Sequence, residues 1–131
     1  MKKMVYSSER KIDVLDTGYC FGLLYYILNL GTHPTAYIKI PESSKYYEKD
    51  MNEIDLEVHG GITYAKDYLY ISENQKIDGY FIGWDYAHYN DYAGYEEKLP
   101  QNLRTGGKKY TTQEIYEEVR EACYELNKIK E

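Results

Sequence analysis

Three histidines lie where predicted strands give way to turns, and each has polar neighbours that could take part in chemistry. His59 precedes two glycines in EVHGGITY, His33 lies in GTHPTAY, and His88 lies in IGWDYAHYNDY. Side chains at strand ends and in loops can converge on one edge of a sheet. The sequence therefore predicts a candidate site formed around these histidines.

The Gly60–Gly61 pair that follows His59 has two interpretations. Glycine accepts positive φ and the close approach of a ligand, and consecutive glycine amides can form a small anion-binding nest. On this interpretation, a phosphate or carboxylate binds the amides beside the histidine. On the other, the two glycines form a tight turn and the histidine is merely exposed.

Asp85, His88 and Asp91 follow one another at intervals of three residues. Residues three apart share a face of a helical turn, so Asp85 and His88 could point together. Aspartate and histidine are competent metal ligands, and a carboxylate can equally fix the tautomer of a histidine that acts as a general base. In the structural alternative, Asp85 caps a turn and His88 forms a hydrogen bond with Asp85.

The catalytic prediction joins these segments into a site for a phosphoester or a nucleotide. In this site, His59 and His88 are general bases or metal ligands, and Asp85 either orients a histidine or is itself a metal ligand. The sequence leaves the metal and any cofactor undetermined. The predicted ligand-binding residues are His33, Gly60, Gly61, Tyr64, Trp84 and Asp91. Two of these have structural alternatives that we favour, because Pro34 fixes a bend beside His33 and Trp84 could fill the core.

Composition and charge exclude some partners. The net charge of −6 disfavours direct binding to nucleic acid or to an anionic membrane, since both need clustered lysine and arginine. An acidic chain can instead bind the basic groove of a nucleic-acid enzyme by imitating phosphate. The 18 tyrosines, against two phenylalanines, predict either core packing by tyrosine or a surface that binds or stacks on a partner.

The expected location is the cytoplasm. No apolar segment follows the basic start of the chain, as it would in a signal peptide. No stretch of consecutive apolar residues is nearly long enough to span a membrane. Cys20 and Cys123 are far apart in the sequence, and we expect both to be reduced residues in or near the core.

Strand patterns dominate the first two thirds of the chain. The continuously apolar range 19–30 fits a buried strand or a helix, and we interpret it as the central strand of a hairpin with 36–40. Asp16-Thr-Gly is a predicted turn, 44–49 a helical turn, and 86–109 a loop. The other predicted strands are 11–15, 56–58, 62–67, 68–71 and 80–84.

The best-defined element is a C-terminal helix. Thr111 or Thr112 would cap it, and Glu114 could complete a capping box. One apolar stripe follows: Ile115, Val119, Ala122, Cys123, Leu126 and Ile129. Residues 1–131 are thus predicted to form a single α+β domain. An antiparallel sheet of about five or six strands would carry the helix on one face, and the other face would be left for solvent or a ligand.

The three histidine segments together resemble a family of small proteins encoded by phages and prophages. LGTHPTAYIKIP, DLEVHGGITYA and FIGWDYAHYNDY are similar to its G-H-x-x-x-Y-V-x-(I/V)-P, V-H-G-G-(L/I)-T-Y and G-F-D-x-A-H-x-G-D segments. The likeness covers roughly residues 20–95 and the closing helix. Thr32 separates Gly31 from the histidine, and Asn90 stands where glycine is usual. The resemblance implies a phage accessory role and these shared polar positions: His33, His59, Asp85, His88 and Asp91.

Three functions remain open on this basis. The leading one is counter-defence, in which the protein is a non-catalytic inhibitor that binds a bacterial defence protein such as a CRISPR effector, or binds a nucleotide signal. The second is a small hydrolase that uses the histidine and aspartate site, with or without a metal. The third is a structural component of the phage, in which the histidines organise turns.

Overall fold

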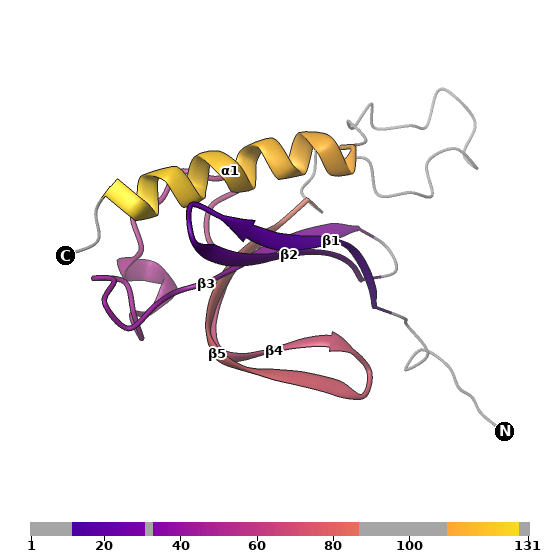
Figure 1. The fold of residues 1–131 in the computed structure, drawn as a ribbon, viewed down its shortest axis with the longest axis horizontal. Helices are drawn as coiled ribbons and strands as arrows, with labels where there is room; N and C mark the ends of the chain where they lie inside the picture. Colours follow the sequence, from indigo (N-terminus) through magenta and orange to yellow (C-terminus); the bar gives the residue numbers. More distant parts are fainter. Residues whose placement is uncertain (1–11, 31–32, 87–109, 129–131) are drawn as a thin grey trace, which may run out of the picture.

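The structure, a computed structural model, describes residues 12–30, 33–86 and 110–128. Five strands form one sheet in the order β1-β2-β3-β5-β4, and every neighbouring pair is antiparallel. One helix lies across a face of this sheet (Figure 1), so the predicted α+β class is confirmed. The elements are β1 (Asp13–Cys20), β2 (Leu23–Asn29), β3 (Pro34–Lys39), η2 (Met51–Glu53), β4 (Tyr64–Ser72), β5 (Gln75–Asp85) and α1 (Thr112–Lys128).

The first hairpin differs from its prediction in the position of its turn. The apolar range 19–30 is neither one strand nor a helix, because Phe21 and Gly22 form a two-residue turn between the paired Cys20 and Leu23. Asp16-Thr-Gly, predicted as a turn, lies inside β1, where the register shifts between Val14 and Asp16. The predicted pairing of 19–30 with 36–40 is confirmed as the antiparallel pair β2–β3.

The β4–β5 hairpin is longer than its predicted pieces. The two predicted strands at 62–67 and 68–71 form one strand, β4, which begins only at Tyr64 and has a register shift between Lys66 and Tyr68. The predicted strand 80–84 is the C-terminal half of β5. Gly83 permits close packing there, because a Cβ at this position would lie 2.4 Å from Cδ1 of Tyr37.

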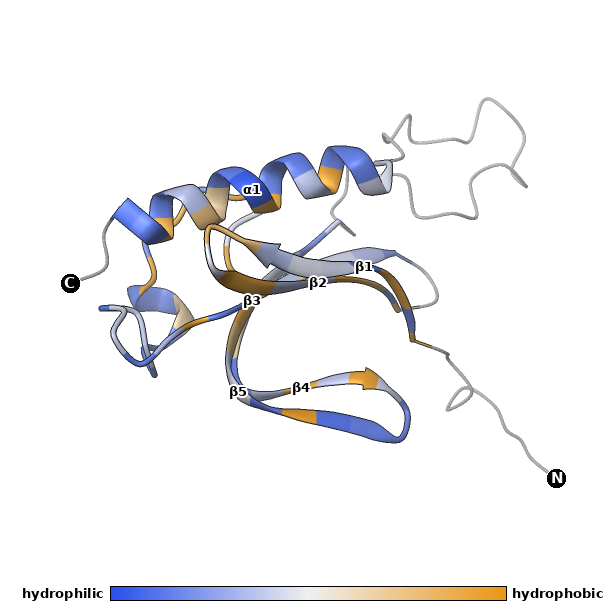
Figure 2. Cartoon of the chain, in the orientation of Figure 1, coloured by the Kyte–Doolittle hydropathy of each residue, from blue (hydrophilic) through white to orange (hydrophobic). Residues whose placement is uncertain are grey.

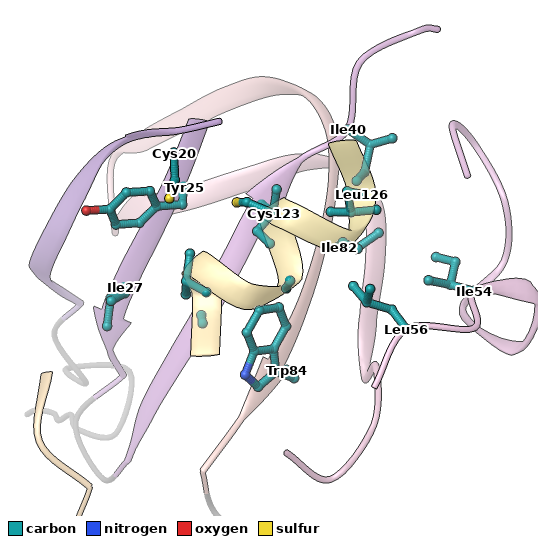
Figure 3. Packing of buried hydrophobic residues seen from close by; sticks show 14 of the residues in the cluster. Cys20, Tyr25, Ile27, Ile40, Ile54, Leu56, Ile82, Trp84, Cys123 and Leu126 are labelled. Carbon is teal, nitrogen blue, oxygen red and sulfur yellow. The ribbon is translucent and has the colours of Figure 1, made fainter. Parts of the chain in front are cut away.

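Both faces of the sheet carry buried apolar residues, so of the two alternatives expected for the face opposite α1, solvent or a ligand, simple exposure to solvent is wrong. The larger cluster lies between the sheet and α1 and includes Ile27, Ile82 and Trp84 (Figure 3). On the opposite face, Leu28, Tyr37, Leu69 and Phe81 form a second buried cluster. This face is covered because the sheet curls until β1 and β4, at the two ends of the strand order, are in contact.

The helix begins as the sequence predicts. The backbone N–H of Glu114 donates to Oγ1 of Thr111 at 3.1 Å, and the N–H of Thr111 donates to Oε1 of Glu114 at 3.0 Å, which is a capping box. The apolar side of α1 faces the sheet (Figure 2). Its buried residues are Ile115, Val119, Ala122, Cys123 and Leu126, while Ile129 lies outside the described residues.

The segment between β3 and β4 packs against the same core without forming a strand. Residues 44–49 form two successive turns in place of the expected helical turn, with hydrogen bonds from Tyr47 N to Ser44 O and from Lys49 N to Tyr46 O. The predicted strand at 56–58 is wrong, since no strand is assigned there. Apolar residues of this segment are nevertheless part of the core, because Ile54 and Leu56 are buried beneath α1.

Candidate functional site

The carboxylate of Glu118, in the middle of α1, accepts hydrogen bonds from three groups of other elements. Its Oε1 accepts Nε1–H of Trp84 at 3.2 Å and the hydroxyl of Tyr86. Its Oε2 accepts the backbone N–H of His59 at 2.7 Å. The indole N–H of Trp84 also lies 3.0 Å from the hydroxyl oxygen of Tyr86. Glu118 thereby ties the helix to the end of β5 and to the Gly-Gly segment.

The Gly60–Gly61 pair forms a tight turn. The N–H of Gly61 donates to Val58 O at 2.9 Å, and the two glycines have φ of 71° and 83°. The turn places the imidazole of His59 on the ring of Tyr86, with centroids 4.7 Å apart and planes 13° from parallel. Tyr110 completes an aromatic cluster with them, since its ring centroid lies 5.0 Å from that of His59 and 4.8 Å from that of Tyr86.

Tyr86 is held as a neutral hydrogen-bond donor. Its side chain is almost fully buried. Burial is the largest cause that raises its pKa above the ordinary value of 10.0, and the hydrogen bond to Glu118 raises it further. A phenol in this state donates to the carboxylate at neutral pH and is a poor nucleophile. Tyr86 is therefore a structural contact in this cluster.

Asp85 lies on the other face of the sheet. Successive side chains of a strand point to opposite faces, and the neighbours Trp84 and Tyr86 both belong to the cluster beneath α1. Asp85 Oδ2 instead accepts the hydroxyl of Thr63 at 3.3 Å. Its charge contributes to the raised pKa of Tyr37, for which burial is the larger cause.

Three predicted ligand-binding residues and the predicted catalytic Asp85 meet in a small pocket at the C-terminal end of β5. His33, Tyr64, Trp84 and Asp85 line it together with Leu30, Thr35, Tyr37 and Thr63, and its volume is about 150 Å³. Pockets for drug-sized ligands are roughly 300–1,000 Å³. This pocket therefore suits water or a small polar group, and it is too small for a nucleotide.

The described residues do not assemble the predicted catalytic set. His59 packs beneath α1, whereas Asp85 lies on the opposite face of the sheet. His88 and Asp91 are outside the described residues. Within ranges 12–30, 33–86 and 110–128, no group of three or more His, Cys, Asp or Glu side chains could hold a metal ion. The structure thus separates the histidine of the Gly-Gly turn from the aspartate that was expected to work with it.

The sequence prediction missed three residues that hold His59 in place: Glu118, Tyr86 and Tyr110. A signal for Glu118 was present, because it is three residues after Ile115 and four before Ala122, and so falls within the apolar stripe of the helix. A carboxylate at such a position needs hydrogen-bond donors from the partner surface. No comparable pattern marks Tyr86 or Tyr110 among the 18 tyrosines.

The two cysteines are buried free thiols, as expected. Cys20 Sγ lies 3.8 Å from the hydroxyl oxygen of Tyr116. The pKa of Cys123 is raised from 9.0 to about 12, chiefly by burial and then by the neighbouring Cys20. A thiol in that environment is a packing group, because the thiolate is the reactive form.

Comparison with known protein families, curated proteins and solved structures finds no match. The site is therefore interpreted from its geometry, and the resemblance to a phage protein family stays a prediction. In the described part of the chain, no helix has the length and apolar character needed to cross a membrane.

Proposed function

We propose that the protein is a phage accessory protein that counters bacterial defence in the host cytoplasm. It would act as a non-catalytic inhibitor that binds a defence protein such as a CRISPR effector. The observation that carries this proposal is the separation of His59 from Asp85, with His59 and Glu118 engaged in packing the helix. The resemblance of the three histidine segments supports the phage role.

Charge supports a protein target that itself binds nucleic acid. The chain carries a net charge of −6, and Glu117, Glu121 and Glu125 are exposed along α1. A nucleic-acid enzyme presents a basic groove, and complementary potential steers an acidic protein toward it. Such an inhibitor needs no catalytic group of its own.

A nucleotide signal is a second candidate target for the same role. A pocket of about 500 Å³ lies beside Lys39 and is lined by Tyr19, Tyr47 and Tyr80. The volume and the aromatic side chains suit a nucleobase. Two carboxylates, Glu42 and Asp78, also line it and would repel phosphates, so we rank this candidate second.

The test is the plating efficiency of a defence-sensitive phage on cells that carry an RNA-guided nuclease, with and without the protein. We expect the protein to restore plating, and His59→Ala to restore it as well at equal protein level. Failure to restore plating, combined with a large closed oligomer in sedimentation, would favour a structural phage component. A folded His59→Ala variant that loses the effect would favour the hydrolase.

A further inference from the structure

Phe21 occupies a backbone conformation that a phenylalanine seldom adopts. It is the first residue of the β1–β2 turn and has φ of 52°, and Gly22 follows with φ of 81°. Two-residue turns with positive φ at both positions strongly prefer Asn-Gly, because asparagine tolerates this region. A bulky residue there is an outlier and carries strain. The turn alone therefore gives no reason for a phenylalanine.

Burial does not explain Phe21 either. Its side chain is 46% exposed, and that of Tyr124, across from it on α1, is 48% exposed. The rings of Phe21 and Tyr124 pack with centroids 5.5 Å apart. We call these two residues the aromatic ridge. An exposed pair of large aromatic side chains is typical of a surface that binds another protein.

Hollows lie on both sides of the Phe21–Tyr124 pair. On one side, Phe21, Leu23, Pro41 and Leu126 are among the residues lining a pocket of about 260 Å³. On the other, Tyr124 borders a groove of about 770 Å³ between α1 and the segment 45–57. Aromatic side chains beside pockets of this kind are the arrangement in which binding energy concentrates at protein interfaces.

The groove beside Tyr124 is acidic. Its charged lining residues are Asp55, Glu57, Glu121 and Glu125, against Lys45, and Glu125 also pairs with Lys128 at 3.7 Å. The apolar part of its lining includes Tyr46 and Leu56. A partner that fits must therefore present cationic side chains next to apolar ones, because complementary charge favours such a segment over a neutral or acidic one.

We propose that the aromatic ridge and the acidic groove together form the interface for a protein partner that presents lysine or arginine beside apolar side chains. This inference rests on the proposed binding function and deepens it by naming the surface and the chemistry of the partner. Phe21 would insert between apolar groups of the partner while the groove pairs with its cations. The strained turn is then the cost of placing an aromatic ring at the tip of the hairpin.

The test uses the purified chain and a short fluorescent peptide of alternating arginine and leucine, with fluorescence anisotropy as the readout. Its counterpart, with glutamate in place of arginine, is the charge control. Phe21→Asn removes the ring and suits the turn, so its melting temperature should be unchanged or raised. Tyr70→Asn is the matched control, because Tyr70 is 46% exposed on β4, outside both hollows.

We expect the basic peptide to bind and the acidic one to fail. Phe21→Asn should weaken binding about tenfold or more, and Tyr70→Asn should leave it unchanged. Glu121→Lys should also weaken binding, whereas Glu73→Lys, which makes the same charge change in the β4–β5 turn, should have little effect. Equal affinity of wild type and Phe21→Asn would overturn the inference, as would absence of binding by the basic peptide.

The two proposals can fail separately. Restored plating of phage by a protein that does not bind the basic peptide would overturn this interface and leave the counter-defence function standing. Binding that depends on Phe21 and Glu121, without any effect on plating, would support the interface and overturn the counter-defence function.

Discussion

The imidazole of His59 lies stacked on the phenol ring of Tyr86, with centroids 4.7 Å apart. The backbone N–H of the same histidine and the hydroxyl of Tyr86 both donate to the carboxylate of Glu118. A histidine placed in this way joins the Gly-Gly turn to the helix. This relationship explains why a histidine precedes the two glycines without assigning it a reaction.

Replacing His59 should affect stability more than function. His59→Ala keeps the backbone hydrogen bond to Glu118 but removes the ring contacts with Tyr86 and Tyr110. We expect a loss of about 1 kcal/mol in the free energy of unfolding, measured by urea denaturation. A loss near zero would mean that the stacking contributes nothing to the fold.

Glu118 should be far more important to the fold than its neighbour Glu117. Glu118→Ala leaves the Tyr86 hydroxyl and the His59 backbone N–H without this acceptor, whereas the Trp84 indole N–H keeps the Tyr86 hydroxyl. We expect the substitution to cost about 2–3 kcal/mol in the free energy of unfolding. Glu117 is exposed and accepts the side-chain N–H of Gln113, one turn earlier on the helix, at 2.8 Å. Glu117→Ala should cost about 0.5 kcal/mol or less. Similar losses for the two variants in denaturant titrations would contradict the structural role of Glu118.

The turn itself can be tested at Gly61. Its φ is 83°, and a Cβ added there would meet no atom within 4 Å. Any effect of Gly61→Ala must therefore come from the backbone conformation, and we expect a loss of about 1–2 kcal/mol. Gly61→Asn, which tolerates positive φ better, should recover part of it. A higher melting temperature for Gly61→Ala than for Gly61→Asn would contradict the positive-φ turn.

Stability should fall at alkaline pH. The pKa of Cys123 is raised from 9.0 to about 12 in the fold, and the pKa values of Tyr37 and Tyr86 are raised above 10.0. The unfolded chain therefore loses these protons first, so the stabilisation is full below pH 9 and declines between pH 9 and 12. Urea titrations at a series of pH values, with reductant present, measure this decline. An unfolding free energy that stays constant above pH 9 would contradict it.

Local sequence rules predicted the elements that local interactions stabilise. The capping box at Thr111 and the apolar stripe of α1 were both found because helix starts and faces follow short-range patterns. The turn at Phe21 was missed because phenylalanine is not a turn residue, and its positive φ cannot be inferred from residue type. Asp16-Thr-Gly was misjudged because pairing with β2 overrode its turn propensity.

The candidate site was harder to predict, because it depends on which face of the sheet each residue occupies. The sequence placed His59 and Asp85 near strand ends, but it could not show that α1 would cover one face and that the curled sheet would bury the other. Glu118 was missed because helical periodicity marks apolar positions, whereas its role depends on donors supplied by β5 and the Gly-Gly turn.

The central claim is that the protein acts by binding through its surface rather than by histidine chemistry. The most direct measurement is the plating efficiency of a defence-sensitive phage on RNA-guided nuclease cells that express wild type, His59→Ala or Phe21→Asn at equal levels. We expect that His59→Ala restores plating like wild type and that Phe21→Asn does not. Loss of the effect in folded His59→Ala, together with full activity of Phe21→Asn, would contradict it.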